Sequence, residues 1–407
     1  MSCLDQFGIH VRSLTVLVDQ QQESNRLNAA RTLYKIAEFR SLQRLKVQFV
    51  GFENPLFYNG ADFIKALILL FGAVGNPVNS DSEANTPLNR SRSNSVEDKD
   101  VTVSNSDAAD DIDPDCLPEK RAKRQESNND DVGSMSDTSS IYFDENYFSP
   151  TRIKEGQLRE VDLSGLKVGF DDRVVSLLAR YHDKLEKLNI QNRIIVVKVT
   201  SECVFDVIKR CRKLRELHCN VWHIHEEALN CLMEDDRAPL EHLSLFGSRF
   251  EKYCKPLEGG VWGKVAKKLP GLRVSLCFDH HCPQHRIHEV MQPDVPVSVL
   301  YLETQTPLLD ELQVVGNFYG KTLEKLVVRA IPPRIGPTID GSLLVVAENC
   351  RLLSALHVFC VLQTETVERI LELHPQLEKS GAFTLKDKKE PHPWVAGRAA
   401  RVPQNLG

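Results

Sequence analysis

A short apolar motif of the form Leu-x-x-Leu-x-(apolar) recurs along the chain, with polar or charged residues between its apolar positions. Positions two apart in a strand face the same way, so the second Leu and the residue two positions later are expected in a core. The intervening residues, such as Lys187 and Glu216, are expected on turns or outer faces. The copies, weaker ones last, are Leu42/Leu45/Val47, Leu158/Val161/Leu163, Leu185/Leu188/Ile190, Leu214/Leu217/Cys219, Leu240/Leu243/Leu245, Leu323/Leu326/Val328, Leu353/Leu356/Val358, Val11/Leu14/Val16, Leu272/Val274/Leu276 and Val297/Leu300/Leu302.

The central residue of the motif advances by 26–31 residues from one copy to the next, except between Leu45 and Val161. This period is typical of a leucine-rich repeat whose coils each supply one strand and one helix. Amphipathic helical stripes fill the intervals, as at Val174, Val175 and Leu178. The pattern therefore predicts an α/β fold, a curved leucine-rich-repeat solenoid. Chance spacing of leucines in another α/β protein is the alternative.

The long interval has a different composition from the repeats. Residues 79–148 contain 17 acidic and seven basic residues, 12 serines and few large apolar side chains. Such a segment cannot offset the entropy of ordering by apolar burial, so we expect a disordered loop. The resulting organisation is N-terminal repeats at 1–75, a disordered acidic Ser-rich insertion at 76–150, the main repeat array at 151–385 and a flexible tail at 386–407.

Charge and cysteine usage narrow the class of protein. The net charge of -5 argues against a strongly basic nucleic-acid binder. Eleven cysteines, an odd number, and a polar Met1–His10 without a signal-peptide core favour reduced thiols in the cytoplasm or nucleus. Lys120–Arg124 matches a nuclear-localisation signal, or is an ordinary charge run. The longest apolar run, Ile64–Val74, is too short for a membrane span. We expect neither nucleic acid nor membrane as a partner.

The form Cys-x-x-Leu-x-x-Leu, at Cys211 and Cys350, resembles the cysteine-containing repeats of F-box proteins. Three stretches resemble F-box only proteins 33 and 39, namely Gly260–Leu276, Val297–Leu326 and Cys350–Leu371. The resemblance covers about Phe7–Phe52 and Arg152–Leu385. It implies a substrate receptor, in which an N-terminal F-box binds the Skp1–cullin ubiquitin ligase and the repeats bind a protein substrate.

An F-box itself is not expected in this chain. The F-box is a helical unit that precedes the repeats, whereas the first strand is expected from Val11. The chain would be a truncated form, an incomplete gene product or a protein that lost the domain. The resemblance thus implies a protein-binding module, the substrate-recognition part of a Skp1–cullin–F-box receptor. The alternative is a scaffold or competitor that binds the same targets without recruiting the ligase.

The exposed strand side of the repeats is expected to carry the protein-binding surface. Trp222 and Phe246 are candidate anchors, because exposed aromatic residues are frequent in interfaces; burial within the coil is the alternative. Asn189, Gln191 and Ser244 are expected on the same side. The full predicted binding surface is His218, Asn220, Trp222, Phe246, Tyr301 and Glu303.

One cluster has the residue types of a metal site. His280, Cys282, His285 and His288 offer imidazole and thiol ligands within a short segment, which would suit Zn²⁺ and a zinc-dependent activity. The favoured interpretation is a polar loop after a strand that ends near Phe278, because a zinc site usually has more closely spaced cysteines. The sequence contains no nucleophile-elbow, Walker, dinucleotide-binding or HExxH motif. We therefore expect no enzyme, metal or cofactor.

Overall fold

The computed structural model describes residues 10–36, 39, 41–50, 58–72, 157–193, 198–248, 257, 260–304, 306–330, 338–379 and 383–385. The chain divides into two units, Met1–Val74 with Pro150–Gly407, and Gly75–Ser149. All described residues belong to the first unit. The expected disordered insertion at 76–150 and the expected tail at 386–407 lie outside the described residues, so the expected domain boundaries stay predictions.

Strands and helices alternate along the described chain. The elements are β1 Ser13–Asp19, α2 Glu23–Ile36, β2 Arg44–Val50, α3 Ala61–Phe71, β3 Glu160–Asp162, η3 Ser164–Leu166, α4 Asp172–Tyr181, β4 Lys187–Asn189, α5 Ser201–Arg210, β5 Glu216–Asn220, η4 Val221–His223, α6 Glu226–Leu232, β6 His242–Gly247, α7 Val261–Lys268, β7 Arg273–Phe278, α8 Gln284–Val290, β8 Val297–Leu302, α9 Leu309–Phe318, β9 Lys325–Val328, α10 Asp340–Asn349, β10 Ala355–Val358, α11 Thr364–Leu373, α12 Pro375–Lys379 and β11 Phe383–Leu385.

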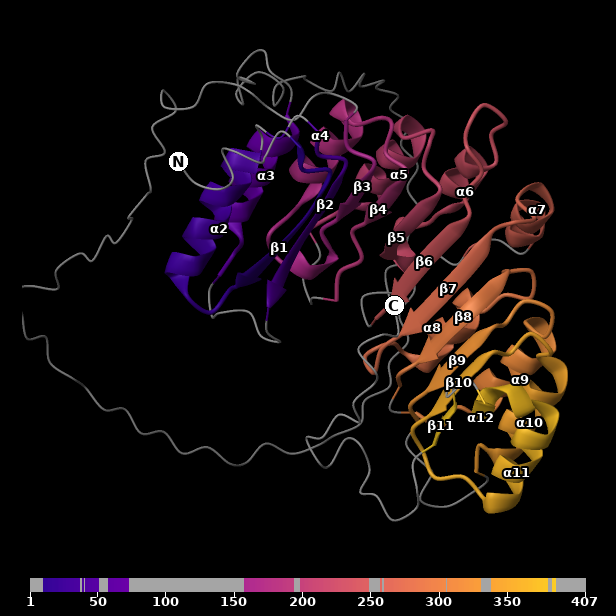
Figure 1. The fold of residues 1–407 in the computed structure, drawn as a ribbon. Helices are drawn as coiled ribbons and strands as arrows, with labels where there is room; N and C mark the ends of the chain where they lie inside the picture. Colours follow the sequence, from indigo (N-terminus) through magenta and orange to yellow (C-terminus); the bar gives the residue numbers. More distant parts are fainter. Residues whose placement is uncertain are drawn as a thin grey trace, which may run out of the picture. The chain divides into compact units, whose positions relative to one another are not determined.

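The strands form one parallel sheet of 11 strands in which spatial order equals sequence order, from β1 to β11. Strand β3 pairs with β2, so the sheet continues across the long interval between Val50 and Glu160. The helices follow one face of the curved sheet (Figure 1). We call the opposite face the concave face. The predicted leucine-rich-repeat solenoid is confirmed.

The apolar positions of the motif form the core between the sheet and the helices. Leu188, Leu217 and Leu243 are each fully buried, as are the residues two positions later in their strands. Parallel strands covered by helices bury such a row continuously, and each repeat shares its core with its neighbours. Cys211 and Cys350 are buried as small apolar residues, as expected from their place before the strand.

Polar side chains cap the first turns of helices α4 and α5. The Asp171 side chain accepts hydrogen bonds from the backbone N–H groups of Arg173 and Val174 at the first turn of α4. Thr200 caps α5 in the same way. Such caps satisfy backbone donors that have no partner within the helix. They fix where α4 and α5 begin.

The pairing register shifts once, between β7 and β8. Val274 pairs with Val297, but Ser275 pairs with Val299, so Ser298 is an extra residue in β8. Leu300 pairs with Leu276, whereas the repeat count places Leu300 opposite Val274. A bulge of this kind adds one residue to one strand without ending the pairing.

The eight described cysteines are buried and carry free thiols. No described helix has both the length and the apolar character needed to cross a membrane.

Candidate functional site

Equivalent positions of successive repeats form rows across the concave face. The first row stands immediately before the central core residue of each strand, and it is charged or titratable from β2 to β7. Its members are Arg44, Glu160, Lys187, Glu216, His242 and Arg273. The second row, two positions later, is Lys46, Asp162, Asn189, His218, Ser244 and Ser275. Lys187 and Glu216 therefore lie in strands, with their side chains on the concave face, so the expected placement on an outer face is confirmed.

From β2 to β5, the members of both rows line an open hollow of about 440 Å³, which also includes residues of β1. Lys46 Nζ lies 3.1 Å from Asp162 Oδ2, and Lys187 Nζ lies 3.0 Å from Glu216 Oε2. Opposite charges thus alternate across neighbouring strands, which is the favourable arrangement for cross-strand pairs. The face offers paired charges and hydrogen-bonding groups on a rigid sheet.

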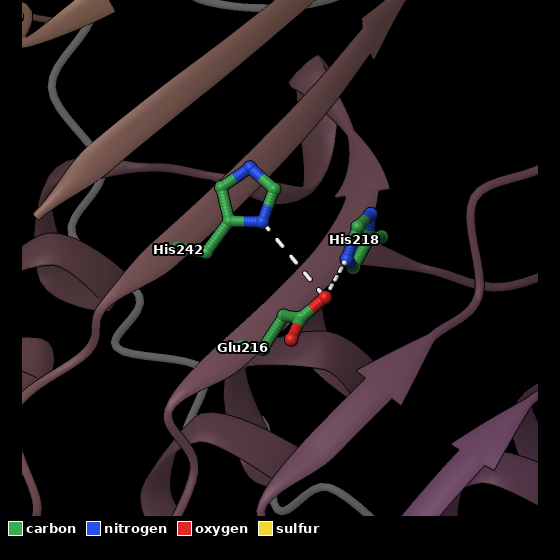
Figure 2. Close-up of side chains that lie close together, drawn as sticks. All are labelled: Glu216, His218 and His242. Atoms are coloured by element: carbon green, nitrogen blue, oxygen red, sulfur yellow. Dashed lines mark hydrogen bonds and ion pairs between the residues drawn. The ribbon is translucent and has the colours of Figure 1, made fainter. Parts of the chain in front are cut away.

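Glu216 and His218 line this hollow, and His242 lies next to them (Figure 2). Glu216 Oε1 lies 2.7 Å from His218 Nε2 and 3.8 Å from His242 Nδ1. The two imidazole rings meet edge to face, with centroids 5.2 Å apart. Glu216 and His218 are two apart in β5, and His242 is the pairing partner of Glu216 in β6. The pairing register of β5 and β6 therefore brings the three side chains together on the concave face.

The electrostatics of this cluster follow from its neighbours. Burial alone would raise the pKa of Glu216, but hydrogen bonds with His218 and Lys187 outweigh burial, and the pKa is lowered. The hydrogen bond with Glu216 raises the pKa of Lys187. Burial, followed by the charge of His218, lowers the pKa of His242. Glu216 is thus held as a carboxylate, and His242 is held towards the neutral imidazole.

Asn220, expected in the binding surface, is fully buried and joins two repeats. Its Oδ1 accepts a hydrogen bond from the Asn192 N–H, and its Nδ2 donates to the Asn192 carbonyl. The Asn192 side chain in turn donates to the Lys167 carbonyl in the repeat before. Exposure of Asn220 was a wrong expectation, because its amide satisfies backbone groups where the chain leaves the strand.

Phe246 is only 1% exposed, so its expected exposure was also wrong. The Arg193 guanidinium lies 4.9 Å from the Phe246 ring centroid and donates to Cys277 Sγ at 3.6 Å. Arg193 therefore stacks on the aromatic ring, a cation–π arrangement. Trp222 lies in η4 and is half-buried beside His223.

The other expected surface residues are partly exposed. Tyr301 lies in β8, with the Lys325 ammonium 5.4 Å from its ring centroid, and Glu303 follows β8, with Arg329 Nε 3.7 Å from Glu303 Oε1. His218, Asn189, Gln191 and Ser244 are likewise half-buried on the concave face. Whether these residues bind a partner stays a prediction.

The cysteine and histidines after Phe278 that the sequence suggested as zinc ligands do not come together in the structure. Cys282 is buried, His285 is exposed, and His288 Nε2 lies 3.0 Å from Glu311 Oε1. Among the described residues, potential metal ligands gather only at Asp279/His280/His281 and at Glu216/His218/His242. His280 therefore has neighbours of the right type, whereas Cys282, His285 and His288 do not join it.

Sequence reasoning missed Arg44, Lys46, Glu160 and Asp162, and it singled out His218 without His242. A signal was present, because the residue before the central core position is charged or titratable in six successive strands. Recognising it required aligning the repeats by strand register as well as by period.

Comparison with curated proteins finds similarity to F-box/LRR-repeat proteins. F-box/LRR-repeat protein 8 from Homo sapiens is 30% identical over 239 residues, which are 58% of this chain and 62% of the relative. The Bos taurus protein of the same name is 30% identical over 238 residues, with the same coverage. F-box/LRR-repeat protein 21 from Ovis aries is 26% identical over 203 residues, 48% of this chain and 44% of the relative.

No family model matches the chain. The chain spans less than two thirds of the length of these relatives. Repeat architecture and sequence similarity agree with each other, since the relatives are named for the same repeat that the sheet displays. Over more than half of its length, this chain is similar to F-box/LRR-repeat proteins.

Proposed function

We propose that the chain is a non-enzymatic protein-binding module, the substrate-recognition part of an F-box/LRR-type receptor of a Skp1–cullin ubiquitin ligase. The observation that carries this proposal is the concave face, where two rows of charged and polar side chains line an open hollow. Alternating charges on a rigid sheet select a partner by electrostatic complementarity and by steering its approach. Similarity to F-box/LRR-repeat proteins supports the ligase context.

The partner follows from the chemistry of the hollow. Lys46 with Asp162, and Lys187 with Glu216, present both signs of charge within a few ångströms. Such a surface suits a protein segment that carries both acidic and basic side chains. We also propose that the chain resembles F-box only proteins 33 and 39 more specifically. We propose that it resides in the cytoplasm or nucleus.

Two experiments test the proposal. Proximity labelling in cells identifies proteins that lie next to the chain, and pull-down with purified Skp1 reports on ligase recruitment. A recognition module labels its target and binds that target after purification. Capture of Skp1 would show that the chain also recruits the ligase by itself, whereas labelling without capture is expected of a recognition part without an F-box and of the alternative, a scaffold or competitor. Absence of any labelled protein that binds the purified chain would overturn the proposal.

A further inference from the structure

The Glu216/His218/His242 cluster has the donor set of a metal site. Two imidazole nitrogens and one carboxylate oxygen lie within 4.8 Å of one another. Two donors come from alternate positions of β5 and the third from the paired position of β6, so a rigid sheet holds all three. The side chains are half-buried, with 22%, 28% and 34% exposure for His218, Glu216 and His242. Each side chain is therefore partly accessible to a solute ion, and Glu216 and His218 face the hollow.

The donor atoms would need to move little to bind Zn²⁺. Zn²⁺ binds imidazole nitrogen and carboxylate oxygen at about 2.0–2.2 Å, so donors in a tetrahedral site lie about 3.3 Å apart. Glu216 Oε1 lies 2.7 Å from His218 Nε2 and 3.8 Å from His242 Nδ1. One separation must widen by about 0.6 Å and the other must shorten by about 0.5 Å to reach the tetrahedral value. Small side-chain rotations accomplish both changes.

Neighbouring residues orient the donors. Ser275 Oγ lies 2.7 Å from His242 Nε2. When Nε2–H donates to this hydroxyl, Nδ1 keeps its lone pair towards Glu216, which is the tautomer that a metal requires. Lys187 holds Glu216 Oε2 at 3.0 Å and leaves Oε1 to face the histidines. Outer contacts of this kind are a regular feature of metal sites in proteins.

We propose that Glu216, His218 and His242 bind Zn²⁺ on the concave face, with a fourth coordination position open towards the hollow. The positive charge of Lys187 opposes the cation, but Glu160 in the next strand lies beside Lys187 and offsets part of it. Two histidines and one carboxylate are a frequent ligand set for Zn²⁺ with one open position. The inference does not depend on the proposed partner, since metal binding is measured on the chain alone.

The test is Zn²⁺ titration by calorimetry, combined with visible absorption after Co²⁺ loading, on the full chain in metal-free buffer. His218→Asn and His242→Asn remove one ligand each. His281→Asn is the matched control, because it removes a histidine from the exposed Asp279/His280/His281 cluster. Circular dichroism confirms that each variant is folded.

The expected result is a Zn²⁺ site and a tetrahedral Co²⁺ spectrum in the wild type, both lost in His218→Asn and His242→Asn and both retained in His281→Asn. Ser275→Ala is expected to weaken binding by about 10- to 100-fold through the loss of the outer contact. Equal binding by the wild type and His242→Asn, or no Zn²⁺ binding by the wild type, would overturn the proposal.

Anomalous scattering from crystals grown with Zn²⁺ provides a test that needs no substitution. An ion among Glu216, His218 and His242 is expected. Ions located only at other residues would overturn the assignment.

Discussion

The side-chain amide of Asn220 forms two hydrogen bonds with the main chain of Asn192, one repeat earlier. Asn220 Oδ1 lies 3.1 Å from the Asn192 nitrogen, and Asn220 Nδ2 lies 2.8 Å from the Asn192 oxygen. Both residues are buried, so water cannot replace these bonds. This contact joins the last residue of β5 to the chain that follows β4, and it makes Asn220 a structural residue.

Asn220→Ala is therefore expected to destabilise the array. The substitution leaves the buried N–H and carbonyl of Asn192 without these partners, which costs about 1–3 kcal/mol. Urea unfolding followed by circular dichroism measures the loss. Asn230→Ala, at an exposed position of α6, is the matched control and is expected to change stability little. Equal stability of the two variants would contradict the structural role of Asn220.

Substitution of core leucines is expected to lower the unfolding free energy more than Asn220→Ala does. Leu217→Ala and Leu243→Ala each remove a fully buried side chain and should lower the unfolding free energy by about 2–5 kcal/mol. Because coils share one core, the loss should extend beyond the mutated repeat. Leu352→Ala is the control, since Leu352 is 54% exposed. Denaturant midpoints that match the wild type for Leu217→Ala would show that the assumed core is wrong.

Acid is expected to weaken the fold through His223. Its Nδ1 accepts from the Asn220 N–H and its Nε2 donates to the Val199 carbonyl, so the neutral ring fits the site. Burial lowers the pKa of His223 from 6.5 to about 4. Between these values the unfolded chain binds a proton that the folded chain excludes, so stability present above pH 6.5 is lost as pH falls, by about 1–3 kcal/mol.

Unfolding free energies at pH 7 and pH 5 test this expectation. His223→Gln should depend less on pH than the wild type, although it is less stable at pH 7. His280→Gln, at an exposed position, should keep the wild-type dependence. The same pH dependence in His223→Gln and the wild type would exclude His223 as the cause. His182, whose pKa burial also lowers to about 4, contributes in the same direction in all three proteins.

The repeat architecture was predictable because it depends on local pattern. A period-2 apolar strand and a helical stripe recur in each coil, so Leu188, Leu217 and Leu243 were identified as core without coordinates. The register shift at Ser298 was not predictable, because the apolar pattern does not mark the residue that the pairing skips.

The candidate site was only partly predictable. His218 was singled out, but its contacts with Glu216 and His242 depend on the alignment of β5 with β6. Asn220 and Phe246 were expected on the surface because they alternate with core residues. Backbone groups of the preceding coil and the Arg193 side chain cover them, and these contacts come from residues that are distant in sequence.

The central claim is that the concave face binds a protein partner. The most direct measurement is the affinity of the partner identified by proximity labelling for two purified double variants. Arg44→Glu/Lys187→Glu reverses two charges on the concave face, and Lys65→Glu/Lys209→Glu reverses two exposed charges on helices α3 and α5. We predict that the first variant binds about tenfold or more weakly, while the second binds like the wild type. Equal affinity of both variants, or a loss confined to the helix variant, would contradict the account.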